Sequence, residues 1–274
     1  MVPLTIASRW GGYEGESMSL FDMSGQVALI TGSSRGIGKA IAEEMAEHGA
    51  KVVISSRKID ACEEIAAAIN AKHGAGTAVA IAANISSKES LQQLVDETRK
   101  AFGKITALVC NAASNPYYGP AGGISDDQFR KILDNNILSN HWLIHMVVPE
   151  MLERGEGSVT IISSIGGLKG STVLGAYAIS KAADMQLARN LADEFGPKGV
   201  RVNCIAPGLI KTDFACALWE NPDNLEVSTR RSSLRRIGEP DEIAGAAVFL
   251  ASKAGGFTTG QTIVIDGGNT SSGG

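Results

Sequence analysis

Two side chains four residues apart could perform acid/base chemistry. Tyr177 and Lys181 lie in a segment with the apolar spacing of a helix, so they share one face of it. A nearby ammonium favours the phenolate and lowers a tyrosine pKa towards the range of a general acid/base. Ser163 and Ser164 end the preceding strand-like run, where a hydroxyl can reach the same substrate oxygen. Without those serines, an exposed helix pair is the alternative interpretation.

Three glycines mark the junction between the first strand-like run and the helix after it. Gly32, Gly36 and Gly38 follow the spacing G-x-x-x-G-x-G. They allow a tight turn, a close backbone approach to a pyrophosphate, and close packing of helix on sheet. Phosphates would then lie at the helix N-terminus, where N–H groups and the helix dipole favour anions. The pattern predicts a dinucleotide site, with a plain tight turn as the alternative.

The end of the second strand-like run should select the cofactor. A carboxylate there would hold the ribose hydroxyls of NAD, but this chain has Ser56 followed by Arg57. Arg35 lies on the glycine-rich loop nearby, and two guanidinium groups suit a 2′-phosphate. We therefore expect NADP(H), with NAD less favoured. For Lys58 a solvated turn is an equally good interpretation.

Short apolar runs alternate with helix-length segments from Val27 onward, which predicts a Rossmann-type, doubly wound parallel α/β sheet with helices on both faces. The expected strands are Val27–Thr31, Lys51–Ser56, Thr77–Ala82, Ala107–Asn111, Ser158–Ser163, Val200–Ile205 and Thr262–Asp266. The expected helices are Ile37–His48, Asp60–His73, Lys88–Phe102, Asp126–Leu152, Gly175–Phe195 and Asp241–Ser252. We expect one catalytic domain over residues 21–274, preceded by a flexible extension over residues 1–20.

Composition and charge narrow the classes of protein and of binding site that the chain could represent. Glycine makes up 32 of 274 residues, well above the average of roughly 7%, and needs a conformational explanation within a globular fold. With 25 basic and 29 acidic residues, the chain has no electrostatic footprint for nucleic acid or an anionic membrane. Four scattered cysteines fit reduced thiols in a cytoplasmic protein. The pair His141 and His145 has metal-ligand spacing but no third ligand nearby in sequence, so we expect no metal site.

The ordered motifs resemble those of the short-chain dehydrogenase/reductases over roughly residues 22–269. They are Thr31-Gly32-(three residues)-Gly36-Ile37-Gly38, Asn111-Ala112-Ala113, Asn136, Ser164, Tyr177-(three residues)-Lys181 and Pro207-Gly208. The resemblance implies that Tyr177 is the acid/base and that Ser164 polarises the carbonyl. It implies that Lys181 binds the nicotinamide ribose and lowers the Tyr177 pKa. Asn136 would hold the water of a proton relay.

The same resemblance implies a set of cofactor contacts around the glycine-rich loop and the strand ends. They are Gly32, Ser34, Arg35, Gly36, Ile37, Gly38, Ser56, Arg57, Asn84, Ile85, Asn111, Ala112, Tyr177, Lys181, Pro207, Gly208, Ile210 and Thr212. Two positions depart from the family pattern: Ala113 replaces a glycine near the cofactor, and Asn84 replaces an aspartate that contacts the adenine.

The expected reaction is reversible hydride transfer between NADP(H) and a carbonyl or secondary alcohol. Finer segments resemble both the NADPH-dependent carbonyl and retinal reductase branch and bacterial 3-oxoacyl-carrier-protein reductases, so a 3-oxoacyl-thioester substrate is an alternative. A non-catalytic NADP-sensing module is a second. Residues 209–236, with Phe214, should cover a small and apolar substrate. The family implies a homotetramer or homodimer, and the absence of a peroxisomal tripeptide at the C-terminus favours the cytoplasm.

Overall fold

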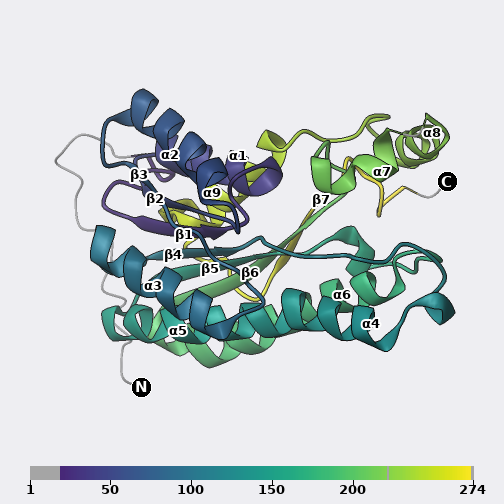
Figure 1. The fold of residues 1–274 in the computed structure, drawn as a ribbon. Coiled ribbons are helices and arrows are strands. Elements are labelled where there is room, and N and C mark those ends of the chain that lie inside the picture. Colours follow the sequence, from purple (N-terminus) through teal and green to yellow (C-terminus); the bar gives the residue numbers. More distant parts are fainter. Residues whose placement is uncertain (1–18, 221, 273–274) are drawn as a thin grey trace, which may run out of the picture.

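Seven parallel strands form the centre of the protein (Figure 1). A computed structural model describes residues 19–220 and 222–272. The strand order β3-β2-β1-β4-β5-β6-β7 confirms the predicted doubly wound sheet. The strands are β1 (Val27–Thr31), β2 (Lys51–Ser55), β3 (Ala78–Ala80), β4 (Ala107–Cys110), β5 (Gly157–Ile162), β6 (Val200–Pro207) and β7 (Thr262–Ile265). The order reverses between β1 and β4, and ligands bind beyond the carboxyl ends of the strands at such a point.

Both faces of the sheet are buried, which explains the nearly continuous apolar strands. Successive residues of β1 contribute to opposite clusters: Ala28 and Ile30 pack with one, and Leu29 packs with the other. The first cluster includes residues of α1 (Gly36–Glu47), α2 (Ile59–His73) and α9 (Asp241–Ala251). The second includes residues of α3 (Lys88–Phe102), α5 (Ser139–Arg154) and α6 (Gly175–Phe195). Figure 1 shows these two helix layers on either side of the sheet. In the described part of the chain, none of the helices combines the length and apolar character needed to cross a membrane.

The expected helix over 126–152 is interrupted. The chain instead forms α4 (Asp126–Leu133), a π-helical turn (Asp134–Leu138) and then α5. Asn135 and Asn136 are buried at this turn and bond polar groups of the neighbouring loops and of α6. An apolar periodicity does not reveal such a turn, because α5 resumes the same spacing after it.

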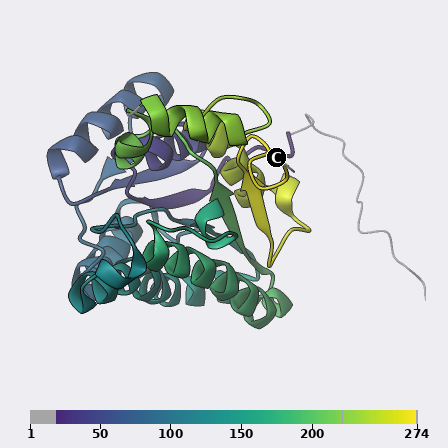
Figure 2. The ribbon, with the colours of Figure 1, turned by 90° about the vertical axis from the view of Figure 1, so that its right-hand side faces the viewer.

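The described residues of the segment 209–236 lie beyond the end of the sheet beside β7, as Figures 1 and 2 show. The segment contains α7 (Cys216–Trp219) and α8 (Pro222–Arg231). The C-terminal loop holds it in place, since the Ser232 hydroxyl donates to the Gly267 carbonyl at 3.0 Å and the Ser272 hydroxyl donates to the Arg231 carbonyl at 2.9 Å. The expected extension at residues 1–20 lies outside the described residues apart from its last two.

Candidate active site

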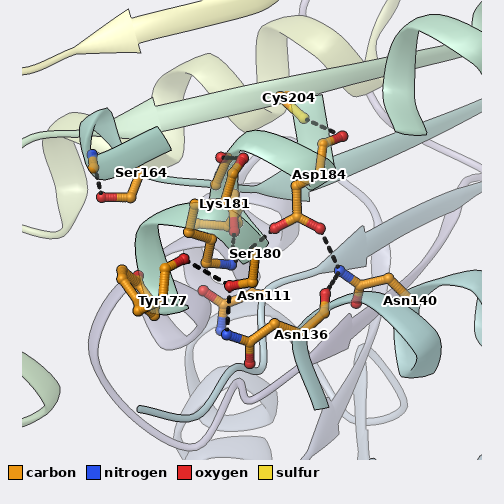
Figure 3. Close-up of polar contacts among 12 residues, drawn as sticks. Asn111, Asn136, Asn140, Ser164, Tyr177, Ser180, Lys181, Asp184 and Cys204 are labelled. Carbon is orange, nitrogen blue, oxygen red and sulfur yellow. Dashed lines mark hydrogen bonds and ion pairs between the residues drawn. The ribbon is translucent and has the colours of Figure 1, made fainter. Parts of the chain in front are cut away.

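The candidate catalytic side chains come from three neighbouring segments (Figure 3). Ser164 lies two residues after Ile162, the last residue of β5, and its backbone is extended there. Tyr177 and Lys181 lie in the first two turns of α6, so the helix places them on one face. Asn136 belongs to the π-helical turn. The fold therefore brings these predicted residues together at the carboxyl end of the sheet.

Lys181 is buried and held from two directions. Its Nζ donates to the carbonyl oxygen of Ile162 at 2.8 Å and to Oδ2 of Asp184 at 3.0 Å. The same nitrogen lies 5.7 Å from the centre of the Tyr177 ring. A charged group buried this deeply requires a partner, and Asp184 supplies one. The charge of Asp184 raises the pKa of Lys181 against the effect of burial, so Lys181 carries its proton at neutral pH.

Opposing influences act on the Tyr177 phenol. Burial raises its pKa above the ordinary value, while the Lys181 charge and a hydrogen bond with Ser164 lower it. The effect of Lys181 has the sign expected from the sequence. Burial nevertheless has the larger effect, so the pKa of Tyr177 is raised. Tyr177 is therefore a phenol at neutral pH, the form that can donate a proton.

Asn136 forms hydrogen bonds with two segments that border the site. Its side chain accepts from the Ser114 backbone N–H at 2.8 Å and donates to the Ser180 hydroxyl at 3.0 Å. Ser180 precedes Lys181 and in turn donates to the carbonyl oxygen of Tyr177 at 2.7 Å. Asn136 thus joins the loop after β4 to the turn of α6 that carries the predicted acid/base.

The glycine-rich loop has the shape that a phosphate site needs. Gly32 has a φ of +67°, which side chains rarely adopt, and a Cβ on Gly38 would lie 2.4 Å from the Gly32 carbonyl oxygen. The Asn111 amide donates to the carbonyl oxygens of Thr31 and Gly32, which joins the loop to the end of β4. Within the described residues, no side chain caps the start of α1. Its first N–H groups can therefore bind an anion.

The predicted phosphate-selecting residues surround the same loop. Ser56 is the first residue after β2, and its hydroxyl accepts from the Lys58 backbone N–H at 3.4 Å. Arg57 is exposed directly after it. Arg35 forms an exposed ion pair with Asp213 at 3.3 Å. Such a pair contributes little stability, so Arg35 can exchange this partner for a phosphate at small cost.

The remaining expected cofactor contacts border this loop or the strand ends. A Cβ on Gly36 would lie 3.2 Å from the methyl carbon of Thr212, which places the chain after β6 against the glycine-rich loop. Ala112 donates its N–H to the Thr31 hydroxyl at 3.1 Å. Asn84 is exposed and accepts from the Ser86 N–H at 3.1 Å. The other members have the following exposure: Ile210 and Pro207 are buried, and Ser34, Ile37, Ile85 and Gly208 are half-buried.

An aromatic residue from the covering segment reaches the catalytic side. The ring of Phe214 lies 6.2 Å from that of Tyr177, with 42° between their planes. Phe214 is 57% exposed, so its surface remains available for contact. This contact brings the segment after β6 to the predicted acid/base, and an apolar substrate between them would be shielded from water.

Comparison with known proteins identifies the family. A family model described as "Enoyl-(Acyl carrier protein) reductase" matches residues 32–270. The mouse protein "Dehydrogenase/reductase SDR family member 4" is 39% identical over 250 residues, which are 91% of this chain and 88% of that protein. The chain belongs to the short-chain dehydrogenase/reductase family. It is therefore an oxidoreductase that interconverts alcohols and carbonyls with a nicotinamide cofactor, and the resemblance to this family that the sequence motifs indicated is confirmed.

Two solved structures of short-chain dehydrogenase/reductases show which ligands this fold takes. A gluconate 5-dehydrogenase from Burkholderia cenocepacia J2315, in complex with NADP and tartrate, is 29% identical with a TM-score of 0.88 over 93% of this chain and 99% of that one. A 7α-hydroxysteroid dehydrogenase, complexed with NADH and 7-oxo glycochenodeoxycholic acid, is 35% identical with a TM-score of 0.86 over 90% and 95%. One of these two structures thus contains NADP and the other contains NADH.

Two further polar residues at the site, Asp184 and Asn140, were not predicted from the sequence. Both are buried polar residues, on α6 and α5, and both connect to Lys181 or Asn136. A signal for Asp184 was present, since it interrupts an apolar helix face at residues 185, 188 and 191. An acid at such a position requires a buried partner. Among the described residues, no group of three or more His, Cys, Asp or Glu side chains could hold a metal.

Proposed function

We propose that this protein is an NADP(H)-dependent carbonyl reductase acting on small apolar carbonyl compounds and the corresponding secondary alcohols, with Tyr177 as the acid/base. The observation that carries the proposal is the buried Lys181 ammonium, which lies 5.7 Å from the centre of the Tyr177 ring on the same helix. Ser164 follows the end of the neighbouring strand β5. A module that only senses the dinucleotide would not require these three side chains together.

In the proposed reaction, Tyr177 and Ser164 act on the substrate oxygen, and Lys181 acts on Tyr177. When bound, the reduced nicotinamide supplies a hydride to the carbonyl carbon. Tyr177 donates its phenolic proton to the oxygen, which completes the alcohol, and in the reverse direction its phenolate accepts that proton. The Ser164 oxygen accepts from the Gly166 N–H at 3.0 Å, so its own hydrogen can point at the substrate oxygen. The Lys181 charge stabilises the phenolate that remains.

The proposed cofactor site runs along the carboxyl end of the sheet. The glycine-rich loop and the start of α1 would bind the pyrophosphate, and Asn84 and Ile85 would border the adenine. Lys181 would bind the nicotinamide ribose, and Thr212 would contact the nicotinamide end. The close approach of Gly38 to Gly32 and Asn111 supports this assignment, because no side chain fits there. Asn136 would hold the water of a proton relay.

The preference for NADP(H) rests on two guanidinium groups and a missing carboxylate. Arg57 follows Ser56 at the end of β2, and Arg35 extends from the glycine-rich loop. Guanidinium groups bind a 2′-phosphate well, whereas an acid at residue 56 would repel it. The bound NADP of the Burkholderia neighbour is compatible with this preference.

We also propose a domain organisation, an oligomeric state and a cellular compartment for the enzyme. Residues 21–274 would form one catalytic domain, and two or four copies would assemble into a homodimer or homotetramer. Four cysteines, all free thiols in the described part of the chain, support a reducing compartment, which we propose to be the cytoplasm. Sedimentation velocity tests the assembly, and a monomer at micromolar concentration would contradict it.

The substitution Tyr177→Phe tests the central assignment. It removes the hydroxyl that donates the proton and keeps the ring, so turnover should fall by about 100-fold or more while NADPH binding stays within about twofold. Steady-state kinetics and nicotinamide fluorescence measure the two effects. Tyr117→Phe is the matched control, because that hydroxyl donates to Pro120 within its own loop. Normal turnover by Tyr177→Phe would exclude Tyr177 as the acid/base.

A further inference from the structure

An acid is buried one helical turn after Lys181. Asp184 lies on α6, and its side chain is wholly inaccessible to solvent. Its neighbours along the same helix face include Met185, Ala188 and Leu191, which belong to the apolar core. The proposed reaction requires Ser164, Tyr177 and Lys181 but assigns nothing to this carboxylate.

Both oxygens of the carboxylate are engaged (Figure 3). Oδ2 accepts from Lys181 Nζ at 3.0 Å, and Oδ1 accepts from the Asn140 amide at 3.1 Å. The same Asn140 amide donates to the backbone carbonyl of Asn136 at 2.6 Å. Asp184 therefore connects the lysine at the active site to α5 and to the π-helical turn.

This ion pair is not explained by stability alone. Taking two charges out of water is costly, and a pair of apolar residues of similar volume often stabilises a protein as much or more. Lys181 already has an acceptor in the Ile162 carbonyl, so the carboxylate adds mainly a negative charge and a fixed direction. Both act on the ammonium that lies beside Tyr177.

We propose that Asp184 is a positioning residue that holds the Lys181 ammonium in a buried ion pair and, through its negative charge, keeps the Tyr177 hydroxyl protonated, which favours carbonyl reduction. The inference rests on the proposed role of Tyr177 as the acid/base. Lys181 attracts the phenolate, and Asp184 offsets part of that attraction. The enzyme thereby keeps a proton ready for the substrate oxygen at neutral pH.

The surrounding charges agree with this role. Asp184 raises the pKa of Tyr177, opposite to the effect of Lys181. Burial raises the pKa of Asp184 above its ordinary value, and Lys181 and Asn140 act against burial by stabilising the ionised form. From the neighbouring strands, the Cys204 thiol on β6 donates to the backbone carbonyl oxygen of Asp184 at 3.4 Å, and the Cys110 thiol on β4 also lies within the range of the Asp184 charge. Burial raises the pKa of both thiols far above the ordinary value, so they stay neutral.

The test is the pH dependence of Asp184→Asn. The amide keeps an oxygen that accepts from Lys181 but removes the charge, so the Tyr177 pKa should fall. Oxidation of a secondary alcohol requires the phenolate, and the midpoint of its kcat/KM profile should move to lower pH by about one unit. The falling limb of carbonyl reduction should move equally. Asp193→Asn removes an exposed acid from the same helix and should leave both midpoints unchanged.

The outcomes separate this inference from the proposed function. A loss of thermal stability without a shift of either midpoint would show a purely structural ion pair and overturn the role of Asp184. If Asp184→Asn does not fold, Asp184→Ser removes the same charge with a smaller side chain. Failure of both to fold would equally overturn the inference, because the carboxylate would then serve the fold. Normal turnover by Tyr177→Phe would instead reject the proposed function itself.

Discussion

At Tyr177, burial and the Lys181 charge act on the pKa of one phenol in opposite directions. Burial raises the pKa, Lys181 lowers it, and the raised value keeps the proton in place at neutral pH. A lysine four residues from a tyrosine therefore does not by itself produce a phenolate. The chemistry depends on how deeply the helix face is buried and on which further charges lie beside it.

Arg57 should discriminate between the two nicotinamide cofactors. Arg57→Ala removes a guanidinium that would bind the 2′-phosphate, so affinity for NADPH should fall by about 10-fold or more, with affinity for NADH within about twofold. Fluorescence titration with both cofactors measures this. Lys58→Ala is the matched control on the adjacent exposed residue and should change neither affinity. Equal losses for NADPH and NADH in Arg57→Ala would refute the phosphate role.

The sequence predicted individual site residues where side-chain chemistry and spacing coincide. Tyr177, Lys181 and Ser164 could be placed because a helical turn and a strand end determine their positions. Asp184 lies three residues after Lys181 on the same helix, but its second partner, Asn140, comes from another helix and could not be assigned from the sequence. The raised pKa of Tyr177 likewise could not be predicted from the sequence, because the burial that causes it is a property of the folded chain.

At the scale of elements, the junction of β1 and α1 depends on one close backbone approach. Gly38→Ala adds a Cβ that would lie 2.4 Å from the Gly32 carbonyl oxygen and 2.5 Å from the Asn111 amide nitrogen. The substitution should lower the free energy of unfolding by about 1–3 kcal/mol. It should also weaken NADPH binding, because the glycine-rich loop must move. Denaturant unfolding and cofactor titration measure the two effects.

Gly245→Ala provides the matched control for Gly38→Ala. Gly245 is also a helical glycine, on the exposed side of α9, and an added Cβ there meets no atom of the described chain within 4 Å. That substitution should stabilise the protein by about 0.5–1 kcal/mol through helix propensity. A neutral Gly38→Ala would contradict the packing account of the loop.

The order and type of the main elements were predictable, whereas their interruptions were not. Buried parallel strands and amphipathic helices have distinct periodicities, so α3 and α6 have the predicted bounds. The π-helical turn depends on contacts of Asn135 and Asn136 with Ser86, Ser114 and Ser180, which lie far apart in sequence. The position of α8 likewise depends on the C-terminal loop through Ser232 and Ser272.

At the scale of the whole molecule, the reversal of strand order places the parts of the site side by side. The glycine-rich loop follows β1, Asn111 follows β4, and Ser164 follows β5, which are neighbours in the sheet. The glycine surplus has a partial explanation here, because several glycines occupy the sharp junctions at this end. The segment after β6 then brings the Phe214 ring beside Tyr177, the proposed acid/base.

The most direct test of the account follows nicotinamide absorbance during turnover of a substrate panel with NADPH and with NADH. The panel should contain apolar ketones, retinal, quinones, diketones and 3-oxoacyl thioesters. The account predicts carbonyl-dependent oxidation of NADPH, fastest with an apolar carbonyl and at least about 10-fold slower with NADH. A preference for the thioesters would shift the substrate class to acyl-chain reduction. Binding of NADPH without turnover of any member would contradict the central claim.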